Sequence, residues 1–219
     1  MKKIIIFLFL ILLVLFTIFI NLKLIQQDPI NDYLDDETFE EYPWHDNVLT
    51  TQFSIGSKGS ENSTAWNGNS VESYGCVDDP INRQGIYPLN CIPKENPFYF
   101  ALPYAGFTYG GAKRESVKNI PWYDSSLDKE GYSFVKNKWI EVKKDEFVCY
   151  AQWEDCIPVD SSGECSDFDY VFENKETSVK IGVGLDISPA LSDCLGMDAP
   201  EDKEFGHSDG YTSWRFIEE

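Results

Sequence analysis

Three consecutive residues, Trp153, Glu154 and Asp155, combine an aromatic ring with two carboxyl groups and could support acid–base chemistry. Cleavage of a glycosidic bond by protonation needs a carboxylic acid with a raised pKa. An aromatic wall and a neighbouring carboxylate would both raise the pKa of Asp155. Asp155 is therefore the candidate general acid, and Trp153 and Glu154 are candidates for contact with a substrate.

Hydrolysis of a glycoside would need a second carboxylate besides Asp155, about 6.5–9.5 Å away for an inverting reaction. The candidates are Glu154, Asp79 and Asp186. A lytic transglycosylase closes the sugar on itself and can use one acid. The alternative for Asp155 is a structural carboxylate that accepts hydrogen bonds from backbone donors in a turn. The residues alone leave these interpretations open.

The elements that would position these side chains are mostly strands. Alternating apolar and polar residues predict a strand at 138–143, and a polar turn separates it from a second predicted strand at 147–153, so the two form a hairpin. Asp155 would then lie in the turn that follows this hairpin. Further strands are predicted at residues 96–103, 178–185 and 212–217.

One short helix is well signalled between the last two of these strands. Ser188 can cap its start, Pro189 suits its first turn and Gly196 can end it. Many short strands with one such helix are typical of a small β-barrel or β-sandwich with long loops. The composition, 42% hydrophobic and 15% aromatic, allows a packed core.

The N-terminus predicts a membrane anchor. Lys2 and Lys3 precede an apolar run over residues 4–20 that only Thr17 interrupts. A spanning helix needs about 20 apolar residues, with about 17 as the lower limit, whereas the apolar core of a signal peptide has about 7–15. We expect residues 1–25 to form an uncleaved transmembrane helix that leaves the C-terminal domain outside the cytoplasm, in a periplasm or at the cell surface. A cleaved signal peptide is the alternative.

An acidic segment follows the apolar run. Residues 26–46 hold eight acids and no Lys or Arg, which predicts an extended tether, and residues 47–219 then form one domain. The whole chain has a formal charge of −19, and its first acid is Asp28. A body this acidic repels phosphate backbones, so we expect no nucleic-acid partner.

An even number of cysteines in an exported domain predicts disulfides. The short spacings favour the pairs Cys76–Cys91 and Cys156–Cys165, which leaves Cys149 to pair with Cys194. Six cysteines allow 15 pairings, and spacing does not exclude the others.

Motifs for cofactors are weak. Gly182 and Gly184 lack the third glycine of a dinucleotide-binding loop, and the chain has only two histidines, His45 and His207. We expect neither a cofactor nor a metal site.

Two segments carry a resemblance to a known family. Residues 149–158 read CYAQWEDCIP, and residues 184–196 read GLDISPALSDCLG. They resemble the rare lipoprotein A-like double-psi β-barrel superfamily, which also holds barwin-like and expansin-like proteins. In that family an N-D-R-G-P-like turn is followed by a D-L-S segment that opens a short helix ending in L-G. The residues that match are Asp155, Pro158, Asp186, Ser188, Leu195 and Gly196.

Residues 93–103 and the closing Trp214-Arg-Phe look like a poorly characterised exported branch of the same superfamily, over about residues 48–217. The resemblance implies a six-stranded double-psi β-barrel with a polysaccharide groove. It also implies that Asp155 is the general acid of any lytic activity. Tyr99 stands where lytic members have a histidine, and we expect it to contact substrate instead.

These observations lead to one expected function and two alternatives. The first is a membrane-anchored domain that binds cell-envelope polysaccharide, of a peptidoglycan-like kind. The second is a lytic transglycosylase or glycoside hydrolase that uses Asp155. The third is a non-catalytic scaffold for an envelope protein partner, which the altered motif and the absent histidine also allow.

Overall fold

The computed structural model describes residues 42–56, 68–80, 82–89, 91–197 and 210–218. The expected transmembrane helix at 1–25 and residues 26–41 of the expected tether at 26–46 lie outside these residues. Within the described ranges, no helix has both the length and the apolar character needed to cross a membrane. The compact unit begins at Tyr42 and its first strand at His45, so the folded domain starts a few residues before the expected boundary at 47.

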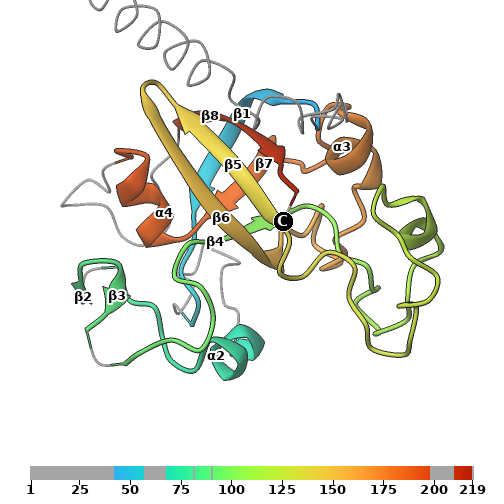
Figure 1. The fold of residues 1–219 in the computed structure, drawn as a ribbon, viewed down its shortest axis with the longest axis horizontal. Helices are drawn as coiled ribbons and strands as arrows, with labels where there is room; N and C mark the ends of the chain where they lie inside the picture. Colours follow the sequence, from blue (N-terminus) through green and yellow to red (C-terminus); the bar gives the residue numbers. More distant parts are fainter. Residues whose placement is uncertain (1–41, 57–67, 81, 90, 198–209, 219) are drawn as a thin grey trace, which may run out of the picture. The chain divides into compact units, whose positions relative to one another are not determined.

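Six strands of the described chain close into a barrel (Figure 1). Around the barrel they follow the order β1-β7-β4-β6-β5-β8, with β1 parallel to β7 and β4 parallel to β6 and the other neighbours antiparallel. The prediction of a mainly β, six-stranded closed barrel is confirmed. The strands are β1 (His45–Gln52), β4 (Tyr99–Leu102), β5 (Trp139–Lys144), β6 (Phe147–Cys156), β7 (Val183–Ile187) and β8 (Gly210–Phe216).

The β5–β6 hairpin is where the alternation predicts it. Its turn lies at Asp145, which has a φ of 51°, and Glu146. β6 continues further than predicted, to Cys156, so Glu154 and Asp155 lie in the strand and not in a turn after it. After a register shift in β4, Asp155 pairs with Ala101. Asp155 therefore has a register partner on β4, whereas Glu154 is the extra residue at the bulge.

Other element boundaries differ from the prediction. β7 begins at Val183, after a turn that Gly182 permits with a φ of 76°, and not at residue 178. The helix α4 (Pro189–Cys194) is confirmed, and Ser188 caps it by accepting a hydrogen bond from the Leu191 N–H at 3.1 Å.

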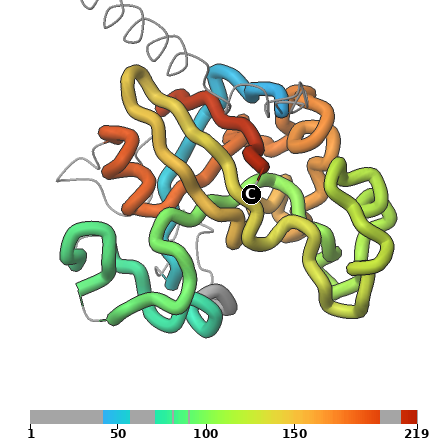
Figure 2. The backbone as a smooth tube through the Cα atoms, viewed as in Figure 1, coloured from blue at the N-terminus to red at the C-terminus, as the bar shows by residue number. Residues whose placement is uncertain are grey.

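The prediction of one short helix was incomplete. The described chain also contains α2 (Gly68–Tyr74), α3 (Phe168–Glu173) and the 3₁₀ helix η1 (Glu115–Asn119). A small two-stranded sheet, β2 (Arg83–Gln84) with β3 (Tyr87–Pro88), lies outside the barrel. Figure 2 follows the long excursion between β4 and β5, which runs beside α3; ring contact between Trp122 and Phe172, 5.6 Å apart, joins the two.

The barrel interior is aromatic. Trp153 and Trp214 are the largest fully buried side chains, and the rings of Trp153 and Phe216 stack at 5.9 Å. A second, smaller core lies against the other face of β4, where Tyr99 contacts Phe53 and Tyr74 edge to face. Because both faces of β4 are covered, all four of its residues are buried.

The predicted disulfide pairing is confirmed in all three pairs. Cys149–Cys194 joins β6 to the end of α4, Cys156–Cys165 closes the loop that leaves β6, and Cys76–Cys91 closes the segment that holds β2 and β3. Two of the three bridges therefore hold the strand that carries Glu154 and Asp155.

The two bridges on β6 should differ in their contribution to stability. Because a bridge that closes a longer loop removes more entropy from the unfolded chain, removing Cys149–Cys194 (separation 45) should lower the free energy of unfolding by about 4 kcal/mol, against about 2.5 kcal/mol for Cys156–Cys165 (separation 9). The measurement is chemical denaturation of the two paired Cys→Ala variants. An equal or larger loss from the short loop would contradict this account.

Candidate functional site

The candidate acid, Asp155, helps to hold the end of β6. Its Oδ1 accepts a hydrogen bond from the Cys156 N–H at 2.7 Å, and its backbone carbonyl accepts one from the Trp153 indole N–H at 2.8 Å. The residue is partly buried. At least one contact of Asp155 is therefore the one expected of a structural carboxylate, a hydrogen bond from a backbone N–H.

Two of the residues expected to contact a substrate, Trp153 and Tyr99, are buried in this structure. Trp153 is 1% exposed and faces the barrel interior, because Cys149, Ala151 and Trp153 are the inward residues of β6. Tyr99 is fully buried; its hydroxyl donates to Asp78 Oδ2 at 2.9 Å and accepts from the Ile55 N–H at 3.1 Å. Neither ring offers a face on which a sugar could stack.

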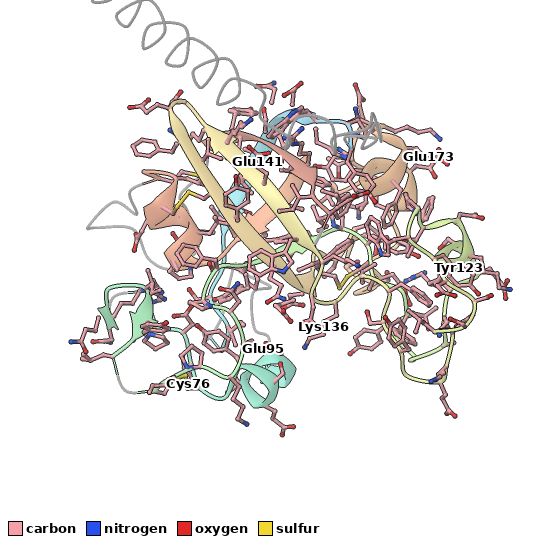
Figure 3. All side chains as sticks on the ribbon, viewed as in Figure 1. Cys76, Glu95, Tyr123, Lys136, Glu141 and Glu173 are labelled. Atoms are coloured by element: carbon pink, nitrogen blue, oxygen red, sulfur yellow. A yellow bond between two sulfur atoms is a disulfide. The ribbon has the colours of Figure 1, made fainter. Side chains whose placement is uncertain are left out.

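Glu154 points away from the barrel interior and is still buried. Its side chain is only 2% exposed, and the Lys136 ammonium lies 3.3 Å from Oε2. The same ammonium lies 2.7 Å from Glu95 Oε1, so one lysine bridges a carboxylate of a loop and a carboxylate of β6. Figure 3 labels Glu95 and Lys136. Glu154 Oε1 has no hydrogen-bond partner among the described residues. We call Glu95, Lys136 and Glu154 the carboxylate cluster.

The environment of Glu154 raises its pKa to about 7. Burial contributes most, and the negative charge of Glu95 adds to it, while the ammonium of Lys136 acts in the opposite direction. A carboxyl group with this pKa is partly protonated near neutral pH. It can therefore donate a proton or accept a hydrogen bond, which is the property that the sequence assigns to its neighbour Asp155.

Sequence reasoning had no signal for the rest of the carboxylate cluster. Glu95 lies in the loop before β4, and Lys136 lies in the long excursion before β5. Both residues are far from Glu154 in sequence. The parallel pairing of β4 with β6 and the β5–β6 hairpin bring them close to it in space.

A second buried polar cluster was also missed. Asp78 is fully buried and forms an ion pair with Arg83. Burial raises the pKa of Asp78, and the Arg83 guanidinium opposes that shift. Since Tyr99 donates to the same carboxylate, this cluster fastens the disulfide-closed segment to β4.

The two other carboxylates that the sequence suggested as partners for Asp155 are Asp186 and Asp79, and each has a hydrogen bond to a residue outside the carboxylate cluster. Asp186 Oδ1 accepts from the Thr51 hydroxyl at 2.9 Å, which links β7 to β1. Asp79 accepts from the Asn82 side chain at 2.5 Å. Over the described ranges, no group of three or more His, Cys, Asp or Glu side chains could hold a metal ion.

Comparisons of the chain with protein-family models, with curated proteins and with solved structures gave no match.

The raised pKa of Glu154 makes stability depend on pH. Between the ordinary pKa of 4.5 and about 7, the folded state keeps a proton at Glu154 that the unfolded state has lost, so stability falls as pH rises through this interval. Glu154→Gln removes this titration. From pH 4.5 to pH 8 the variant should gain about 1–2 kcal/mol relative to the parent, after allowance for solvent screening. Urea denaturation across this range measures the difference, and parallel pH curves for both proteins would refute it.

The cause of the shift can be tested separately. Glu95→Gln should lower the pKa of Glu154, because a neighbouring negative charge is removed, and Lys136→Met should raise it, because the opposing cation is lost. Carbon NMR titration of the Glu154 carboxyl measures both. Glu173→Gln, at an exposed position in α3, is the matched control and should leave the titration unchanged. The explanation fails if Glu95→Gln leaves the Glu154 pKa where it was.

Proposed function

We propose that the chain is a membrane-anchored extracytoplasmic protein whose double-psi β-barrel domain binds cell-envelope polysaccharide of a peptidoglycan-like kind. The observation that carries the proposal is Glu154, a buried carboxyl whose Oε1 is unpaired within the described part of the chain. An unpaired buried acceptor is unfavourable, and a sugar hydroxyl would satisfy it. Because the side chain is only 2% exposed, a sugar would reach it by displacing the half-exposed Lys136 side chain.

Two features of the fold support the double-psi assignment. The barrel has six strands, and it contains two parallel pairs, β1 with β7 and β4 with β6. The resemblance in sequence falls on β6 and on the β7–α4 segment, which each belong to one of these pairs. The sequence motifs thus fall on β6 and β7, and each of these strands belongs to one of the two parallel pairs.

The extracytoplasmic location has separate support. All six cysteines are paired, and disulfides of this kind persist in oxidising compartments. The apolar run at residues 4–20 is long enough for a signal anchor. The acidic body would avoid anionic polymers, so a neutral or cationic glycan is the better ligand.

A glycan-cleaving enzyme, such as a lytic transglycosylase, is the second candidate. The observation that favours it is the pKa of Glu154, about 7, because a general acid must carry a proton near neutral pH. In this version Glu154 donates the proton to the leaving oxygen, and Asp155 holds the strand end. Asp155 could instead be the general acid of the same site. Substitution of each carboxyl in turn distinguishes the two assignments.

The proposed function predicts that the full-length protein, in detergent micelles, co-sediments with purified insoluble peptidoglycan. Glu154→Gln, which keeps the shape but alters the acceptor, should weaken this binding by about tenfold. Glu146→Gln makes the same change at an exposed turn position and should bind as the parent does. If neither the parent nor the control sediments with the polymer, the polysaccharide proposal is wrong. The alternative, a scaffold that binds a protein partner, would then remain.

The same samples separate binding from catalysis. Soluble fragments released by the parent, and lost in Glu154→Gln, would assign the acid to Glu154. Fragments lost only in Asp155→Asn would assign it to Asp155. Binding without release would identify a binding module.

A further inference from the structure

A cavity of about 450 Å³ lies between the start of β1, the end of α3 and the start of β7. It shares no residue with the carboxylate cluster, so it is a separate candidate site. A cavity of this size is within the range of small-molecule pockets. The lining residues on which the argument depends are His45, Asp46, Tyr170, Lys175, Glu176 and Gly184.

His45 supplies a buried hydrogen-bond acceptor in this cavity. The residue is 4% exposed, and its ring stacks on Trp214 with centroids 3.9 Å apart. Burial lowers the pKa of His45 to about 4, so the ring is neutral near pH 7. The Val171 backbone partly opposes this shift, and the buried Nδ1 atom has no hydrogen-bond partner in the described chain. Nδ1 is therefore an unused acceptor.

The charges around the cavity favour a cation. The carboxylates of Asp46 and Glu176 line it, and both residues are exposed. Lys175 also lines it, but its ammonium is held by Asp169 at 2.8 Å and by Glu173 at 2.6 Å. The net field at the cavity is negative, and the available side-chain groups are mostly acceptors.

Gly184 lets the Tyr170 side chain pack directly against the backbone of β7 beside the cavity. A Cβ atom at this position would lie 2.2 Å from the Tyr170 hydroxyl oxygen and 2.8 Å from a Val48 methyl group, so no larger residue fits. The Tyr170 hydroxyl accepts a hydrogen bond from the Trp214 indole at 3.2 Å. Because Trp214 also stacks on His45, the glycine, tyrosine and tryptophan together fix the position of the histidine ring.

We propose that this cavity binds a small hydroxylated ligand with an ammonium group, of the amino-sugar class. The ammonium would lie near Asp46 and Glu176, and a hydroxyl or ammonium proton would satisfy His45 Nδ1. A ligand with an acidic group would meet two carboxylates and be repelled. A neutral sugar would offer hydroxyl donors but would gain nothing from the negative field.

The test is isothermal titration of the full-length protein in micelles with D-glucosamine, D-glucose or N-acetyl-D-glucosamine, at slightly acidic pH and low salt. D-Glucosamine should bind about tenfold more tightly than the two uncharged sugars, because only it carries the cation. Equal affinity for glucosamine and glucose would overturn the proposed ligand class, and absence of heat at millimolar glucosamine would overturn the site.

Variants locate the binding. Glu176→Gln removes one lining charge at an exposed position and should weaken glucosamine binding several-fold. Glu130→Gln removes the same charge from an exposed loop outside the cavity and is the matched control. His45→Phe keeps a ring against Trp214 and removes the acceptor, and should weaken binding further. Equal affinity in Glu176→Gln and Glu130→Gln would contradict the location.

The carboxylate cluster is a separate control. Glu154→Gln changes no lining residue of this cavity and should leave glucosamine binding unchanged. Loss of glucosamine binding in Glu154→Gln would contradict the cavity and indicate the carboxylate cluster. Failure of peptidoglycan binding would not affect the titration.

Discussion

Closure of the barrel depends on a very short antiparallel contact. β4 and β7 pair through two residue pairs, Phe100 with Ile187 and Ala101 with Asp186, and this contact turns an open six-stranded sheet into a closed one. Each of the two strands also has a parallel partner, β6 or β1. Every strand edge in the ring is therefore satisfied, and the aromatic interior around Trp153 and Trp214 is sealed from water.

The burial of β4 on both faces explains why the site differs from the one expected. Phe100 and Leu102 face the barrel core, and Tyr99 and Ala101 face the second core with Phe53, Ile55 and Tyr74. A strand in this position cannot present Tyr99 to a ligand. The alternation in β6 acts in a similar way, since it turns Trp153 into the barrel interior and Glu154 away from it. The loops that carry Glu95 and Lys136 then cover Glu154, and that cover raises its pKa.

Those parts of the fold that depend on local pattern could be predicted from sequence. The β5–β6 hairpin follows from alternation, α4 from its Ser188 cap and Pro189, and the disulfides from short spacings. β1 was missed because it begins within an acidic, Asn-containing stretch whose pattern is broken by a register shift between His45 and Val48. The start of α3 had a cap signal, Asp167, that the surrounding polar loop concealed.

The carboxylate cluster could not be predicted, for a physical reason. The protonation of Glu154 is set by groups from two loops, and their distances to it follow from tertiary packing and not from spacing along the chain. The sequence drew attention to this segment because it places an aromatic residue next to two carboxyls, and apolar surroundings raise the pKa of a carboxyl. Strand alternation then decides which one: Trp153 must face inward, so its immediate neighbour Glu154 must leave the interior and meet the loops. Asp155, one residue further, lies where β6 meets the register shift in β4, and its Oδ1 accepts from the Cys156 N–H. The division of roles between the two carboxyls is therefore a consequence of the bulge and the pleat.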